Sequence, residues 1–198
     1  EVLADREVSW PLTRAMCAPI GDGAAGALLV SERRLRELPA AVRERAVRVA
    51  ATALSGGKYR SLDEPGLSRV AAQKAYAQAG VGPEAIDVAE VHDATAFCEL
   101  YQAEMLGFCE EGRGGAFVES GATTLGGRLP INTSGGLVSK GHPVGATGLS
   151  MIAELTEQLR GEAGARQVPG AHTALAENGG GVVGFDEAAC SVVILQRG

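Results

Sequence analysis

The sequence predicts a layered α/β fold with a buried sheet, and three observations lead to that prediction. Short apolar runs alternate along the chain with segments of helical period, an order typical of a sheet covered by helices. Aromatic residues make up only 4% of the chain while 28 of its 198 residues are glycine, which favours close packing through small residues. The length corresponds to one domain, or to one domain and a piece of another.

In the first half of the chain, turn residues divide predicted strands from predicted helices. Residues 19–31 (PIGDGAAGALLVS) begin with a glycine turn and end in an apolar run, which predicts a buried strand, and residues 32–38 predict a short helix that a proline ends. Residues 47–54 (VRVAATAL) are rich in β-forming residues before a Gly-Gly turn, so we expect a strand. Apolar side chains at helical spacing predict a helix over residues 67–79. The alternation in residues 86–91 (IDVAEV) predicts another strand.

The second half begins with a predicted helix over residues 95–106, which ends at a glycine. Residues 109–128 are glycine-rich and acidic, and we expect a loop there that holds one helical turn at most. A helix follows over residues 145–161. Two apolar runs, residues 173–176 and 191–195, predict strands joined by a second glycine loop (NGGGVVG).

Charge and hydropathy narrow the classes of function. The net charge is −6 with no block of basic residues, which argues against nucleic acid as the main partner. No window approaches the roughly 18–20 apolar residues of a membrane span. The cysteines show neither a CxxC pair nor the density of a disulfide scaffold, which favours a reducing, cytoplasmic location. Residues 1–14 carry no initiator methionine, signal peptide or helix cap, so we expect a fragment, a processed product or a subunit of a split protein.

Residues 132–148 (NTSGGLVSKGHPVGATG) are the most informative stretch of the chain. Glycine permits positive φ and close approach of a ligand, and the proline after His142 holds that residue away from the α region. We therefore expect a stiff, irregular loop that presents an imidazole just before a helix, an arrangement suited to proton transfer near neutral pH. The alternative is a tight structural turn with an incidental surface histidine.

Two further loops follow predicted strands: residues 91–97 (VHDATAF) and residues 176–181 (AENGGG). Ligands of α/β folds commonly gather at the carboxyl ends of strands. If the three loops converge, one pocket receives two imidazoles and two carboxylates, which are groups suited to acid–base catalysis. The candidate residues are His92, Asp93, His142, Glu177 and Asn178.

Structural alternatives exist for these residues. Asp93 can cap the helix that begins near Thr95, His92 can be a semi-buried histidine with satisfied hydrogen bonds, and residues 178–181 can form only a hairpin-like connection. A zinc site built from the three histidines and four cysteines is disfavoured because no ligand pair has the usual close spacing. Residues 112–115 (GRGG) match neither a Walker loop nor a dinucleotide fingerprint. We therefore predict no metal and no cofactor.

The motifs of these loops resemble those of the thiolase superfamily, in the family's order. Gly141–Pro143 matches its Gly-His-Pro, and His92–Ala94 stands where the sterol-carrier-protein-type (lipid-transfer) branch carries His-Asp-Cys-Phe. Residues 177–181 stand where many thiolases carry Cys-x-Gly, and residues 17–32 resemble the strand that completes the N-terminal half of the fold. The chain is thus similar to the C-terminal half of a thiolase-superfamily protein, nearest the lipid-transfer branch.

The resemblance implies a mixed sheet of βαβαββ type with helices, in which residues 1–38 are the tail of the N-terminal half and residues 39–198 are the C-terminal domain. It also implies an acyl-CoA substrate and a carbon–carbon bond made or broken beside the thioester carbonyl, with coenzyme A as part of the substrate. A thiolase's nucleophilic cysteine belongs to the N-terminal half. The acid–base cysteines of the matched motifs are replaced by Ala94 and Glu177, and Thr95 replaces a phenylalanine.

These departures resemble members of the lipid-transfer branch that act as retro-aldolases on steroid side-chain CoA thioesters, with a small OB-fold, zinc-ribbon partner. We expect His142 to polarise or protonate a substrate oxygen, and His92 to orient a water or donate to the thioester oxygen. Glu177 would take over proton transfer from the lost cysteine. The expected substrate-binding residues are Asp93, Asn178, Gly179, Gly180 and Gly181.

We expect the chain to work with acyl-CoA and with a protein partner or an N-terminal half, in a homo- or hetero-oligomer. Two other classes stay open: a non-catalytic acyl-CoA-binding or lipid-transfer subunit, and a structural fragment that stabilises a partner. A nucleophilic cysteine in the N-terminal half would favour a thiolase, and its absence would favour an aldolase or a binding protein.

Overall fold

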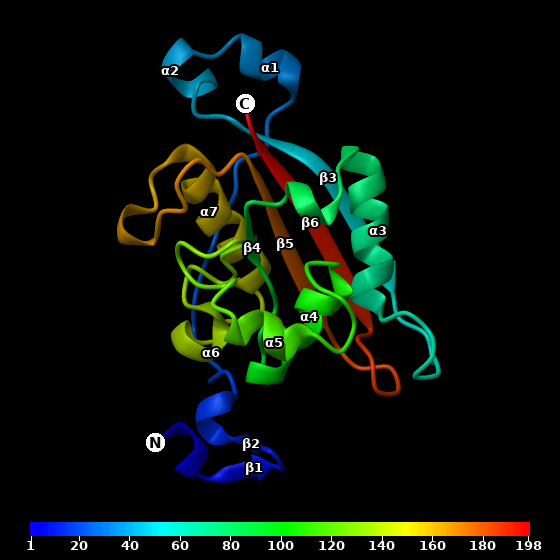
Figure 1. The fold of residues 1–198 in the computed structure, drawn as a ribbon. Helices are drawn as coiled ribbons and strands as arrows, with labels where there is room; N and C mark the ends of the chain where they lie inside the picture. The colour runs from blue at the N-terminus through cyan, green and yellow to red at the C-terminus, as the bar shows by residue number, and fades with distance from the viewer.

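The computed structural model describes residues 1–198, and a four-stranded mixed sheet forms its centre (Figure 1). The strand order is β3 (Val47–Gly56), β6 (Ala189–Arg197), β5 (Thr173–Gly180) and β4 (Val88–Glu90). Strand β6 runs antiparallel to both of its neighbours, whereas β4 runs parallel to β5. The layered α/β fold expected from the sequence is therefore confirmed.

Helices cover both faces of this sheet (Figure 1). Helix α7 (Thr147–Arg160) packs on one face, where its apolar side chains meet Ala174 of β5. Helices α3 (Leu67–Ala79) and α4 (Ala96–Met105) lie over the other face, where the alanines of α3 join the cluster around Leu175. Successive residues of a strand point to opposite faces, so β5 contributes to both cores.

Shorter elements surround this body, and every helix is too short or too polar to traverse a lipid bilayer. A small hairpin and two helical turns precede an extended segment that leads to two short helices. In Figure 1 that hairpin lies at one end of the molecule and the short helices α1 and α2 at the other. These elements are η1 (Val2–Ala4), β1 (Glu7–Ser9), β2 (Leu12–Thr13), η2 (Arg14–Met16), α1 (Glu32–Arg36) and α2 (Ala40–Arg43). Within the body lie η3 (Pro83–Ala85), α5 (Gly114–Glu119), α6 (Gly136–Lys140) and η4 (Gly164–Arg166).

The buried strand predicted over residues 19–31 is wrong. The segment is extended but belongs to no sheet, and its side chains Leu28 and Leu29 are 91% and 77% exposed. Its first residues are bonded to the loop of His142, because the backbone N–H of His142 donates to the carbonyl of Pro19 at 2.8 Å. An apolar run becomes a buried strand only beside another strand, and no strand of this chain lies beside it.

The other predicted elements are present within a few residues of their expected bounds. Strand β5 is longer than predicted and continues to Gly180, so most of the expected AENGGG loop is strand, and the true turn begins at Gly181. Helix α6 was not predicted. It is five residues long and begins at a glycine, so it has no visible apolar period.

Candidate active site

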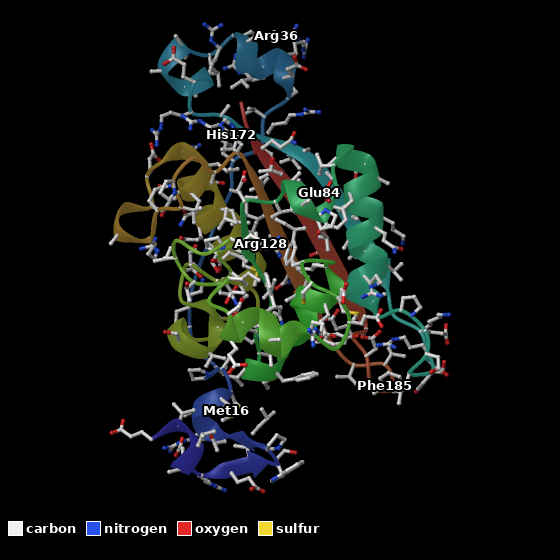
Figure 2. All side chains as sticks on the ribbon, viewed as in Figure 1. Met16, Arg36, Glu84, Arg128, His172 and Phe185 are labelled. Atoms are coloured by element: carbon white, nitrogen blue, oxygen red, sulfur yellow. The ribbon has the colours of Figure 1, made fainter.

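Two histidines meet at the carboxyl end of β4. His92 follows this strand, and His142 lies in the loop between α6 and α7. Their ring centroids are 4.9 Å apart and the ring planes meet at 79°, an edge-to-face arrangement. The third histidine, His172, directly precedes β5 and is exposed at the opposite end of the sheet (Figure 2). The structure therefore brings together the two histidines that the motifs singled out.

Hydrogen bonds determine which nitrogen of His142 carries a proton. The hydroxyl of Thr147 donates to the carbonyl of Pro143 at 3.1 Å, so its oxygen accepts from Nδ1–H of His142 at 2.8 Å. In the neutral ring Nε2 then keeps its lone pair, and in the charged ring Nε2–H is a donor. Because the ring is half-buried and held in this way, it differs from the incidental surface histidine of the alternative interpretation.

His92 is held in its neutral form. Burial, and after it the neighbouring His142, lowers the pKa of His92 from 6.5 to about 4. A neutral imidazole offers one N–H donor and one acceptor. No group of the chain forms a hydrogen bond with either ring nitrogen of His92, since only its backbone N–H is bonded. The ring therefore differs from the satisfied, semi-buried histidine of the alternative and is free to bind a ligand atom.

Glu177 lies directly behind His92 and is fully buried. Its Oε2 accepts from the backbone N–H of His92 at 3.0 Å, and its Oε1 accepts from the thiol of Cys190 at 3.3 Å. Burial, and after it the charge of Glu187, raises the pKa of Glu177 from 4.5 to about 8. The carboxyl thus contacts the loop of His92 through the backbone N–H of that residue, and its own proton-transfer role stays a prediction.

Asp93 caps a helix, but not the one that the alternative interpretation named. Its Oδ1 accepts from the backbone N–H of Leu137 at 2.7 Å and its Oδ2 from that of Val138 at 3.4 Å, both in α6. Helix α4, which follows Thr95, has no side-chain cap. A side chain at Gly136 would collide with the Asp93 carboxylate, so this position needs glycine. Asp93 therefore joins the two histidine loops, and its role in substrate binding stays a prediction.

A second link between these loops was not predicted. The fully buried Glu90 accepts from the backbone N–H of Ser134 at 3.0 Å and from its hydroxyl at 2.5 Å, and Lys140 Nζ lies 3.8 Å from the same carboxylate. Asn132, in the left-handed region with φ of 54°, accepts from the backbone N–H of Val91 at 2.9 Å. The one sequence signal for this link is a glutamate inside the otherwise apolar run VAEV.

Most of the predicted glycine loop, residues 176–181, is the end of β5, and only its last residue begins a turn. The antiparallel pairing of β5 with β6 shows that it is also a hairpin connection, as the alternative interpretation held. Gly179 is buried beneath Glu187, whereas Gly180 is exposed. Asn178 lies close to Gly148 of α7, and its buried Oδ1 has no hydrogen-bond partner within the chain. Substrate binding by these residues stays a prediction.

Comparison with known proteins shows the family. Residues 58–197 match the family described as "Thiolase C-terminal domain-like", and the chain belongs to it. It is 45% identical to sterol carrier protein 2 of Homo sapiens, over 96% of this chain and 38% of that protein. It is 40% identical to the acetyl-CoA acetyltransferase of Methanothermobacter thermautotrophicus, over 93% of this chain and 48% of that enzyme. The chain thus spans less than half the length of these relatives.

Among solved structures, the chain is similar to one described as "Ltp2-ChsH2(DUF35) aldolase". The TM-score is 0.80 with 27% sequence identity, and the match covers 98% of this chain and 50% of that one. The resemblance to lipid-transfer thiolases and their aldolase relatives that the motifs indicated is therefore confirmed.

Proposed function

We propose that the protein makes or breaks a carbon–carbon bond beside the thioester carbonyl of an acyl-CoA, with His92 and His142 acting on substrate oxygens. The observation that carries this proposal is the pair itself. One imidazole is kept neutral with both nitrogens free, and the other has its tautomer set by Thr147. Family membership supports the substrate class.

The two rings would have different tasks. His92 donates its N–H to the thioester oxygen, where negative charge develops when the adjacent carbon carries an electron pair. A donor aimed at such a charge contributes about 3–4 kcal/mol to lowering a barrier. His142 exchanges a proton at Nε2 with the second substrate oxygen, because its Nδ1–H is already given to Thr147. Glu177 acts on the site through the backbone N–H of His92.

The retro-aldol direction is the version that the site favours, because it needs no thiol. His142 removes the proton of a β-hydroxyl, the Cα–Cβ bond breaks, and the carbonyl product leaves. The electron pair passes to the thioester as an enolate that His92 stabilises, and the imidazolium of His142 returns the proton to the α-carbon. Ala94 replaces one family cysteine, and burial raises the pKa of the Cys190 thiol, which faces Glu177.

The protein partner, the acyl group, the oligomeric assembly and the cellular location belong to the same proposal. The proposal includes a protein partner of the OB-fold, zinc-ribbon kind and a steroid side-chain acyl group, both of which the sequence resemblance implies. The similarity to an aldolase whose name has two components supports the presence of a partner. We also propose that the protein assembles as an oligomer and acts in the cytoplasm. A second candidate is a non-catalytic acyl-CoA-binding or lipid-transfer subunit, which the similarity to sterol carrier protein 2 favours.

One experiment separates these candidates. The native protein, with any chain that co-purifies, is incubated with a β-hydroxyacyl-CoA with and without free coenzyme A, and products are identified by mass spectrometry. We expect a shortened acyl-CoA and a released carbonyl compound without free coenzyme A. Binding without cleavage under both conditions would support the binding subunit and reject the enzyme.

A further inference from the structure

A second group of reactive side chains lies behind the histidine pair. It comprises Glu177 of β5, Glu187 in the turn between β5 and β6, and Cys190 of β6. One ligating atom of each lies within 4.8 Å of the others. Glu177 and Cys190 are fully buried and Glu187 is half-buried. Two carboxyls this close in a dry interior cannot both ionise cheaply.

The hydrogen bonds of Glu187 fit an ionised carboxylate. Its Oε2 accepts from the hydroxyl of Ser68 at 3.1 Å, and its Oε1 accepts from Nε2 of Gln102 at 3.1 Å. Gln102 is buried and its own Oε1 has no partner, so the amide turns its donor to Glu187 and leaves its carbonyl unpaired. Gly179 gives the carboxylate the room that any side chain there would remove.

The contacts of Glu177 fit a protonated carboxyl. Its Oε2 accepts from the backbone N–H of His92, as a carbonyl oxygen does. Its Oε1 accepts from the Cys190 thiol, and a carboxyl hydroxyl can accept one hydrogen bond while it donates another. A carboxyl oxygen of Glu187 lies within 4.8 Å of one of Glu177.

No cation offsets a second negative charge in this cluster. Neither glutamate forms an ion pair, because the nearby Arg60 is already paired with Asp186 at 2.5 Å and donates to the hydroxyl of Tyr101 at 3.1 Å. The groups that face the two carboxyls from the surrounding elements are thus neutral or acidic. They are Ser68, Tyr101, Gln102, Asp186, Cys190 and the neutral His92.

We propose that Glu177 and Glu187 share one proton at neutral pH, with the proton on Glu177, and that Glu187 is the positioning residue that keeps it there. The pair then carries one negative charge behind His92 instead of two. A second charge would raise the affinity of the His92 ring for a proton and remove the neutral donor from the site. The effect on turnover rests on the function proposed above, whereas the shared proton is a property of the fold.

Infrared difference spectroscopy of the native protein measures this proton without substrate. We expect the C=O band of a protonated carboxyl at pH 7, which is absent in Glu177→Gln and retained in the control Glu119→Gln, an exposed glutamate. In Glu187→Gln the pH at which this band has half its intensity, the titration midpoint, should fall by about one unit or more. The reason is that the negative charge of Glu187 no longer opposes ionisation of Glu177. Glu187→Asp should restore most of the midpoint.

Two results would overturn the proposal: no protonated carboxyl at pH 7 in the wild-type protein, or an unchanged midpoint in Glu187→Gln. Where turnover of an acyl-CoA is measurable, the alkaline limb of its pH profile should follow the infrared midpoint in each variant. If the infrared result holds and the protein turns over no acyl-CoA, the proposed function fails while the shared proton stands.

Discussion

Replacing Glu177 by glutamine should remove a specific pH dependence of stability. The native carboxyl has a pKa of about 8, against 4.5 in an ordinary exposed glutamate. Between these values the native state binds more protons than the unfolded chain, so the free energy of unfolding falls as pH rises. Each unit of pH changes it by about 1.4 kcal/mol for one proton.

Other groups restrict the window in which this change is visible. The pKa of His92 is lowered from 6.5 to about 4, so the native state binds fewer protons there and stability rises with pH up to 6.5. Burial raises the pKa of Glu99 to about 6, so this residue makes the free energy of unfolding fall with rising pH only up to about pH 6. From pH 6.5 to 8 the Glu177–Glu187 pair contributes a fall of about 2 kcal/mol. Burial also raises the pKa of Glu90, so the comparison with Glu177→Gln is needed to isolate the contribution of the pair.

Thiol labelling of Cys190 measures this change locally, because the thiol is fully buried in the native state. Urea titrations at pH 6.5 and pH 8, each ended with a saturating labelling pulse, give the free energy of unfolding of this domain. We expect the wild-type protein and the control Glu119→Gln to lose about 2 kcal/mol across the interval, and Glu177→Gln to lose much less. An equal loss in all three proteins would refute the assignment.

The remaining predictions concern the loops, the exposed segment and the chemistry. Glu90→Gln should destabilise the native protein by about 1–3 kcal/mol, because it replaces one of the two carboxyl oxygens that accept from Ser134 and face Lys140. It should also lower kcat more than it changes KM, and an unchanged kcat would contradict that role. Replacing both Leu28 and Leu29 by serine should weaken association of the chain with its partner or with itself, since these apolar side chains are exposed. Sedimentation velocity measures this association, and an unchanged profile would show that the segment is not an interface. The protein should cleave 3-ketoacyl-CoA with free coenzyme A at a rate far below that of an ordinary thiolase, because Ala94 has no thiol and the thiol of Cys190 is buried. Turnover near ordinary thiolase rates would reject this prediction.

The layers of the fold could be predicted because its longer elements carry their own period. Helix α3 shows apolar spacing and ends at a glycine, and β3 ends in a Gly-Gly turn, so both were located closely. The segment that includes Leu28 was assigned wrongly, because an apolar run does not reveal that no other strand of this chain lies beside it. Helix α6 was missed because it is short and shows no apolar period, and because Asp93, which caps it, is far from it in sequence.

The residues of the candidate site that lie in recognisable motifs could be predicted from the sequence. The burial of the other residues could not, because it depends on tertiary packing. His92 and His142 were expected to converge because both lie in motifs that follow one family's order, and the structure places their rings together. The burial of Glu177 could not be read from a glycine-rich sequence that in fact continues β5. Glu187 gave no signal, since an acidic residue in a turn is ordinarily solvated.

The most direct test of the central claim compares His142→Gln with the matched control His172→Gln, an exposed histidine at the other end of the sheet. Acyl-CoA affinity and the rate of carbon–carbon bond cleavage are measured on the native protein and on both variants. We expect His142→Gln to keep its affinity and to lose about 10²-fold or more in kcat, and His172→Gln to match the wild type. Wild-type kcat in His142→Gln would contradict the account, because the imidazole would then exchange no proton with the substrate.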